Sequence, residues 1–405
     1  MPAGKAAPAG FTCRSRRANC SVAKRSTWVL TTPGEKHSKV LRAGKSARNA
    51  DMGVSVVIAL AGSQAAATDP DRGAAGLPGG SPGQAPIVVY IAGSGRSGST
   101  LLERALGEIP GFVNVGELID LYRRTAAQDE RCGCGAAFTE CPFWARVGDR
   151  AFGGWPEQQL AAAHRLQGRV ARQRRMPRLL AMPLAGHQFR ADVAAYGASY
   201  DMLYRAIAAE ASAACVVDAS KWPVQALALA RGGLDVRVIH LVRDVRGVAY
   251  SLGKRDVSRP HAVREADVMS HLSPAMAAAR WVAVQSQAGL LRRCGLPVTR
   301  MRYEEFVRHP RAAVEAALAD IGLAAPSAHL AHIGDGRVVL GTSHGLSGNP
   351  SRFRDGEITL RADETWRTSM SRRDRLVVTA IGLPLMLRYG IATARGKAKK
   401  QDAHD

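Results

Sequence analysis

One stretch near residue 90 constrains the fold of this chain more than any other. Residues 87–92 are mostly β-branched or aromatic, residues 93–98 contain three glycines, and apolar residues recur at helical spacing from Leu101 onward. This order predicts a buried strand, a tight loop and the start of a helix. Because the backbone N–H groups of such a loop and helix attract anions, and Arg96 adds a cation, we expect a cradle for a phosphate or sulfate group.

The loop has the spacing of a nucleotide-binding P-loop with one difference. Gly93 and Gly98 stand five residues apart, but Ser99 occupies the position of the P-loop lysine. In a P-loop that lysine reaches the outer phosphates, and the next hydroxyl binds magnesium. Its absence disfavours a magnesium-dependent kinase and favours a donor that carries less charge.

The loop resembles the 5′-phosphosulfate loop of sulfotransferases that use 3′-phosphoadenosine 5′-phosphosulfate (PAPS) as the sulfuryl donor. A Gly- and Ser-rich turn without a ligand is the alternative. The resemblance implies that PAPS is the co-substrate and that the 5′ end of PAPS is bound by Gly93, Gly95, Arg96, Ser97, Gly98, Ser99 and Thr100.

Three later stretches extend the resemblance to the rest of the nucleotide. Arg243 ends a predicted strand and Ser251 follows eight residues later, a pair that suits a phosphate monoester and resembles the family's 3′-phosphate site. Tyr303 lies in a stretch similar to the one whose tyrosine approaches the adenine. Residues 348–356 resemble the loop that closes over the 3′-phosphate, although Asp355 stands where that loop has lysine. This similarity implies phosphate contacts from Arg352, Arg354 and Gly356.

The candidate catalytic residues are Glu117, Arg96 and Lys221. Residues 215–221 resemble the family's Asp-Ser-Ser-Lys signature, with Ala219 in place of the first serine. Cytosolic sulfotransferases carry a histidine base 22 residues before the 3′-phosphate arginine, where this chain has Lys221, a cation that cannot accept a proton.

Glu117 follows the predicted strand 112–115, in the position of the glutamate base of tyrosylprotein and related bacterial sulfotransferases. Ligands bind at the carboxyl ends of parallel strands. We therefore expect Glu117 to be the general base, while Arg96 and Lys221 stabilise the developing charge. Alternatively, Glu117 only compensates a helix dipole.

Three of the seven cysteines, Cys132, Cys134 and Cys141, lie within ten residues and suggest a metal site. A structural zinc site takes four ligands, and the nearest further candidate in the sequence is His164. Because no fourth ligand is nearby, we expect no metal. Scattered cysteines in odd number fit a reducing compartment.

The chain divides into three parts by composition. Residues 1–86 contain 12 Lys and Arg against 4 Asp and Glu and lack a periodic apolar pattern, which predicts a disordered basic leader and linker. Residues 87–392 form the predicted sulfotransferase domain, with a helical insertion over 145–214. Residues 393–405 are a charged tail that we expect to fray.

The net charge of +22 suits anionic ligands. Nucleic acid is disfavoured as a partner because aromatic residues make up only 5% of the chain and no zinc-finger or RNA-binding motif is present. No stretch reaches the roughly 20 apolar residues of a membrane span, so we expect no membrane partner and a cytoplasmic protein. Seven arginines against two acids in 151–200 indicate either solvated helix faces or a site for an acidic acceptor.

The sequence thus predicts an α/β fold with a P-loop-like parallel β-sheet flanked by helices. The expected reaction moves a sulfuryl group from PAPS to a hydroxyl or amine of a small-molecule, carbohydrate or other hydroxyl-bearing acceptor, without a metal. Two other functions stay open. One is a small-molecule kinase, for which Asp218 would bind magnesium. The other is a nucleotide-binding module without catalysis.

Overall fold

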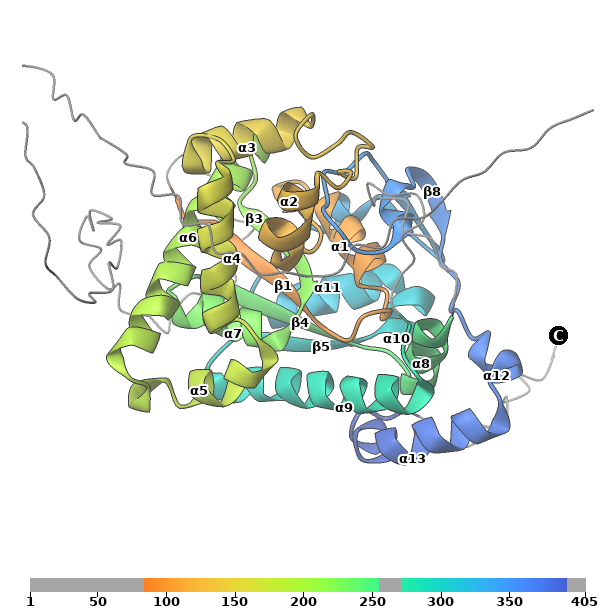
Figure 1. Ribbon diagram of the computed structural model, residues 1–405. Coiled ribbons are helices and arrows are strands. Elements are labelled where there is room, and N and C mark those ends of the chain that lie inside the picture. Colours follow the sequence, from red (N-terminus) through yellow and green to blue (C-terminus); the bar gives the residue numbers. More distant parts are fainter. Residues whose placement is uncertain (1–83, 255–270, 392–405) are drawn as a thin grey trace, which may run out of the picture. The chain divides into compact units, whose positions relative to one another are not determined.

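The computed structural model describes residues 84–254 and 271–391 (Figure 1). Backbone contacts divide the chain into Met1–Thr68 and Asp69–Asp405, and every described residue belongs to the second unit. Nearly all of the predicted leader and the whole predicted tail lie outside the described residues.

Five parallel strands form the central sheet, which confirms the predicted α/β class. Strand β1 is in the middle, in the order β2-β3-β1-β4-β5. Buried on both faces, β1 reads as a continuous apolar run, as expected for a parallel strand covered by helices. The strands span Ile87–Gly93 (β1), Phe112–Asn114 (β2), Cys215–Lys221 (β3), Val236–Val242 (β4) and Val298–Arg302 (β5).

Alternate residues of β1 contribute to two different cores. Val89 and Ile91 belong to a core that includes residues of α1 (Ser99–Gly107) and α11 (Pro310–Asp320). Val88 and Tyr90 belong to another, with residues of α6 (His187–Ala211) and α7 (Pro223–Arg231). The remaining helices are α2 (Ala126–Gln128), α3 (Pro142–Phe152), α4 (Glu157–Val170), α5 (Met176–Leu180), α8 (Val245–Gly253), α9 (Pro274–Leu290), α10 (Tyr303–Arg308), α12 (Trp366–Ser369) and α13 (Arg372–Arg388).

The helical segment between β2 and β3 is longer than the predicted insertion. Helical turns begin at Leu118, directly after β2, and a cysteine-containing loop separates them from α3. Helix α3 starts at Pro142, whose missing N–H is no loss in a first turn. Helix α6 ends this segment and packs against both α3 and α7.

A second, antiparallel sheet was not among the sequence predictions. It contains β6 (Ile333–Gly334), β7 (Arg337–Leu340) and β8 (Gly356–Thr359) in the order β6-β7-β8. Between β7 and β8 the chain runs through residues 341–355, here called the return segment. In the described part of the chain, no helix combines the length and apolar character needed to cross a membrane.

The return segment is bound to the end of β2. Leu346 donates its N–H to the Val115 carbonyl at 2.9 Å and accepts from the Glu117 N–H at 2.8 Å. Gly116 between them has φ +76°, and a Cβ there would lie 2.1 Å from the Leu346 carbonyl oxygen. Only glycine allows this approach, which places the return segment beside Glu117.

Candidate functional site

The strand register brings the predicted catalytic groups to one edge of the sheet. Ala92 of β1 pairs with Lys221 of β3, and Gly93 pairs with Leu241 of β4. The loop 94–98 therefore leaves the sheet beside Lys221 and beside Arg243, which follows β4. Glu117 joins them from the end of β2.

Two residues at this edge have a left-handed backbone. Arg96 has φ +64° and Lys221 has φ +70°. This conformation costs a non-glycine residue roughly 1–2 kcal/mol, and such strain concentrates at functional sites. In the loop, Gly98 has φ +87°, and a Cβ there would lie 2.5 Å from the Tyr303 ring, so that ring packs directly on the loop.

Two cavities meet at this edge. The first, here called the loop cavity, has a volume of about 420 Å³ and is lined by the loop, the start of α1 and the return segment. The second, the helical cavity, measures about 570 Å³ and is lined by residues between 117 and 174 together with α9. The residues that line both are Gly95, Glu117, Asp120, Arg124, Lys221 and Arg280.

Glu117 and Lys221 form an ion pair where the cavities meet. Their side chains are 15% and 13% exposed, and both line the two cavities. Lys221 also donates to the Ala219 carbonyl at 3.3 Å. Burial lowers the pKa of the nearby Arg96 guanidinium from its ordinary value, and the Glu117 carboxylate opposes this effect.

Arg243, Ser251 and Tyr303 line the loop cavity, as do Arg96, Gly98, Ser99 and Thr100. Arg243 donates to the Arg96 carbonyl at 2.9 Å and to the carbonyl and carboxylate of Asp363 at 2.8 and 3.2 Å. Its guanidinium also lies 4.6 Å from the centre of the Tyr303 ring. Arg243 thus ties the loop to the end of β4.

Several predicted nucleotide contacts lie elsewhere. Arg352 is buried and donates to the carbonyls of Gly345 and Ser347 at 3.0 and 2.9 Å. It therefore holds the return segment together instead of lining the loop cavity, and burial lowers its pKa to about 10. Arg354, Gly356 and the buried Ser97 line neither cavity, and Gly93 lines only the helical one.

The stretch 348–356 was predicted to close over the nucleotide through Arg352, Arg354 and Gly356, but other residues of the return segment line the loop cavity. Ser347, Gly348 and Asn349 of the return segment line it, and the Asn349 N–H lies 3.4 Å from the Thr100 hydroxyl. A Cβ on Gly348 would lie 3.0 Å from a Glu117 carboxylate oxygen. The sequence Ser-Gly-Asn at 347–349 is typical of a turn, but nothing near it in the chain indicates that the turn faces Glu117.

A buried carboxyl group behind the site was also missed. Glu103 of α1 is 2% exposed, and its Oε2 has no hydrogen-bond partner among the described residues. Burial raises its pKa to about 8, while Lys221 partly opposes the shift. Glu103 lies among the apolar residues of the predicted helix, and nothing in the sequence marks it as buried.

The chain was compared with protein families, solved structures and curated proteins. A family model described as the sulfotransferase family matches residues 86–327. Among solved structures, the chain is similar to the sulfotransferase domain of the Synechococcus PCC 7002 olefin synthase (20% identity, 74% of this chain, 94% of that chain, TM-score 0.39). It is also similar to the sulfotransferase domain of the curacin biosynthetic pathway (16% identity, 74% and 97%, TM-score 0.41). No match was found among curated proteins.

We predict that Glu103 makes stability depend on pH. The folded chain keeps the Glu103 proton up to about pH 8, whereas the unfolded chain releases it near the ordinary value of 4.5. The folded state therefore binds more protons in this window, and the free energy of unfolding falls as pH rises through it. Glu103→Gln should flatten the fall and stabilise the protein above pH 8.

Urea unfolding across this pH range measures the effect, with exposed Glu140→Gln as the matched control. Parallel pH profiles for wild type and Glu103→Gln would contradict the assignment.

Proposed function

Because the chain belongs to the sulfotransferase family, we propose that it transfers a sulfuryl group from PAPS to an acceptor hydroxyl or amine. The observation that carries this proposal is the junction of two cavities at Glu117 and Lys221. An in-line displacement at sulfur needs the acceptor on one side and the leaving oxygen on the other. We assign the donor to the loop cavity and the acceptor to the helical cavity.

The loop cavity offers binding groups for both ends of PAPS. Ser99 and Thr100 begin helix α1, whose N-terminus favours the anionic 5′-phosphosulfate. Arg243 and Ser251 supply a guanidinium and a hydroxyl for the 3′-phosphate. Tyr303 lies beside Arg243 and lines the same cavity, where its ring can contact the nucleotide.

The residues at the junction can accept the proton of the acceptor and stabilise the negative charge on the leaving oxygen. The acceptor oxygen forms a new bond to sulfur while the bond from sulfur to the phosphate oxygen breaks. Glu117 takes the acceptor proton, and 3′,5′-ADP leaves. Lys221 and Arg96 stabilise the charge that develops on the leaving oxygen.

The kinase alternative is weakened by the environment of Asp218. One carboxylate oxygen accepts from the Tyr204 hydroxyl at 2.6 Å and the other from the Ser220 N–H at 2.8 Å. Asp218 is fully buried and lines neither cavity, so it is poorly placed to bind magnesium.

We predict that Arg243 and Ser251 recognise the 3′-phosphate. Arg243→Ala should weaken 3′,5′-ADP binding by about 10- to 150-fold, the value of a charged hydrogen bond, and Ser251→Ala by about 2- to 12-fold. Both variants should weaken 5′-AMP binding less than 3′,5′-ADP binding, because 5′-AMP lacks the 3′-phosphate. Titration calorimetry measures the affinities for both nucleotides, with exposed Arg231→Ala as the control.

Equal losses for 3′,5′-ADP and 5′-AMP would mean that Arg243 only supports the loop. Tighter binding of ATP–Mg²⁺ than of 3′,5′-ADP to the wild type would favour a kinase.

We predict that Glu117 is the general base. Glu117→Gln preserves size but cannot accept a proton, so kcat for release of 3′,5′-ADP from PAPS should fall by about 10²–10⁴-fold in the presence of an acceptor. Affinity for 3′,5′-ADP should stay close to wild type. Exposed Glu305→Gln is the control. Near-normal turnover by Glu117→Gln would mean that another group takes the acceptor proton. A wild type that binds PAPS without turnover on any acceptor would indicate a binding module.

The helical cavity is strongly basic, which suggests the charge of the acceptor. Asp120, one of the two acids that line it, is paired with Arg123 at 2.7 Å and with Arg124 at 3.6 Å. The cationic lining residues are Arg123, Arg124, Arg172, Arg174, Lys221 and Arg280. We infer that the acceptor carries an anionic group beside its hydroxyl.

We predict a preference for acidic acceptors that depends on Arg172 and Arg174. The kcat/KM for 4-hydroxybenzoate should exceed that for 4-hydroxybenzyl alcohol. The double variant Arg172→Ala and Arg174→Ala should reduce this preference by roughly two- to fivefold, because both arginines are solvent-exposed. Arg178→Ala, whose guanidinium packs on Phe189 outside the cavity, is the control. An unchanged preference would leave these arginines as solvated helix residues.

A further inference from the structure

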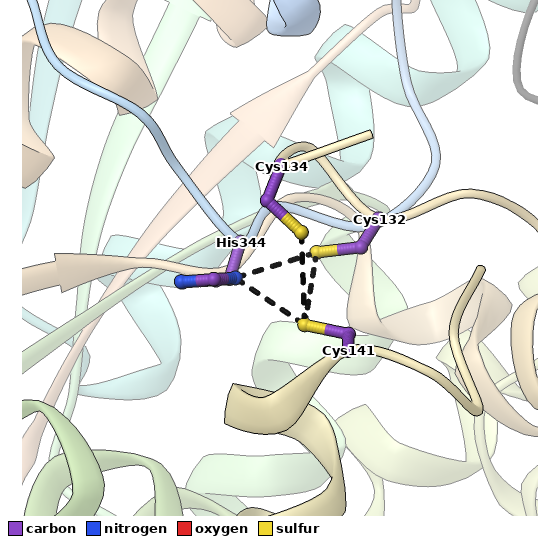
Figure 2. Close-up of side chains that lie close together, drawn as sticks. All are labelled: Cys132, Cys134, Cys141 and His344. Atoms are coloured by element: carbon purple, nitrogen blue, oxygen red, sulfur yellow. Dashed lines mark hydrogen bonds between the residues drawn. The ribbon is translucent and has the colours of Figure 1, made fainter. Parts of the chain in front are cut away.

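The cysteine-containing loop and the return segment meet at a cluster of four side chains that the proposed reaction does not use. Cys132, Cys134 and Cys141 come from the loop before α3, and His344 comes from the return segment. Figure 2 shows the three sulfur atoms and the imidazole converging on one point. We propose that this cluster is a structural zinc site.

The distances between the candidate ligand atoms match a tetrahedral metal. The Cys141 sulfur lies 3.6 Å from that of Cys132 and 3.8 Å from that of Cys134. The His344 Nδ1 lies 3.6 Å from the Cys132 sulfur and 3.4 Å from the Cys141 sulfur. Tetrahedral zinc with ordinary bond lengths separates two sulfurs by about 3.8 Å, and a sulfur from a nitrogen by about 3.6 Å.

A disulfide or an iron–sulfur cluster fits these side chains less well than zinc. The sulfurs are far beyond the roughly 2.05 Å of a disulfide, and an odd number of thiols cannot pair completely. An iron–sulfur cluster spreads its protein ligands over two or more irons, so the Cys141 sulfur would not lie this close to both other sulfurs. Three thiolates and one imidazole favour zinc, and four protein ligands leave no open position for catalysis.

The surrounding structure holds the ligands in place. Cys132 and Cys141 are fully buried. The His344 ring stacks on Phe143 at 4.7 Å between centroids and 4° between planes, and its carbonyl accepts from the Trp144 indole at 2.9 Å. These contacts fix the ring with Nδ1 toward the sulfurs, as expected of neighbours that orient a metal ligand.

The cysteine-containing loop also approaches the return segment very closely. The Gly133 N–H donates to the Gly345 carbonyl at 3.0 Å, and a Cβ on Gly133 would lie 2.6 Å from the Ser343 carbonyl oxygen. The Cys132 N–H donates to the Ala136 carbonyl at 2.8 Å and so closes the turn that contains Cys134. Backbone and ligands therefore join the same two segments.

The sequence predicts no metal, because no fourth ligand lies near the three cysteines in the chain. That premise does not hold in the structure, since His344 supplies the ligand from more than 200 residues away. His164, the candidate near the cysteines in sequence, lines the helical cavity instead. A metal here would hold the return segment, including the residues 347–349 that line the loop cavity.

Zinc content of the untagged full-length protein tests the proposal without reference to its activity. We expect about one zinc per chain in wild type by elemental analysis. Cys134→Ser and His344→Ala should lose it, whereas Cys294→Ser and His164→Ala, as matched controls, should retain it. His344→Cys should also retain zinc, because a fourth thiolate completes a common zinc site.

Cobalt substitution gives a second readout should a ligand variant fail to fold. Wild type refilled with Co²⁺ should show the intense visible bands of a tetrahedral ion and thiolate-to-metal charge transfer. Protein from zinc-supplemented cells with neither zinc nor a cobalt spectrum would overturn the proposal. So would stoichiometric iron, or zinc that survives in folded Cys134→Ser and His344→Ala variants.

Discussion

The parallel pairing of β1 with β3 and β4 is the constraint on which the site depends. Parallel strands end at the same edge. The pairing of the strands is therefore enough to bring together the loop after β1, Lys221 at the end of β3 and Arg243 after β4. The left-handed backbone at Arg96 and at Lys221 then turns the chain sharply at that edge in both places. The strain is tolerated because the apolar strands behind it are fully buried.

The fold and much of the edge were predictable because their signals are local. An apolar β-branched run, a glycine loop and a helix pattern lie within 16 residues. Arg243 and Ser251 are only eight residues apart. Arg352 shows where local similarity fails. It stands in a loop-like sequence, but a short turn over Pro350–Phe353 directs it inward to backbone carbonyls. His344 could not have been placed, because its partners precede it by more than 200 residues.

The small antiparallel sheet fixes the return segment in place. Strands β7 and β8 hold the two ends of the segment together, while Leu346 joins its middle to the end of β2. Arg352 donates to two carbonyls within the segment, those of Gly345 and Ser347, and so helps to satisfy its buried backbone. A loop of this length loses much entropy on ordering, and these anchors offset that loss. The result is a fixed wall opposite the start of α1.

The partners of Arg243 set a condition on how a donor can bind. Its guanidinium already donates to the Arg96 carbonyl and to the Asp363 carboxylate. A 3′-phosphate on the same guanidinium would lie beside that carboxylate, and two anions at one cation repel each other. The Asp363 side chain is 41% exposed, so water can solvate its carboxylate when a phosphate takes its place on Arg243. The bond to Arg96 needs no such replacement. Under the proposed function, Arg243 would exchange Asp363 for the phosphate while it continues to hold the loop, and 3′-phosphate binding would then be coupled to the position of Arg96.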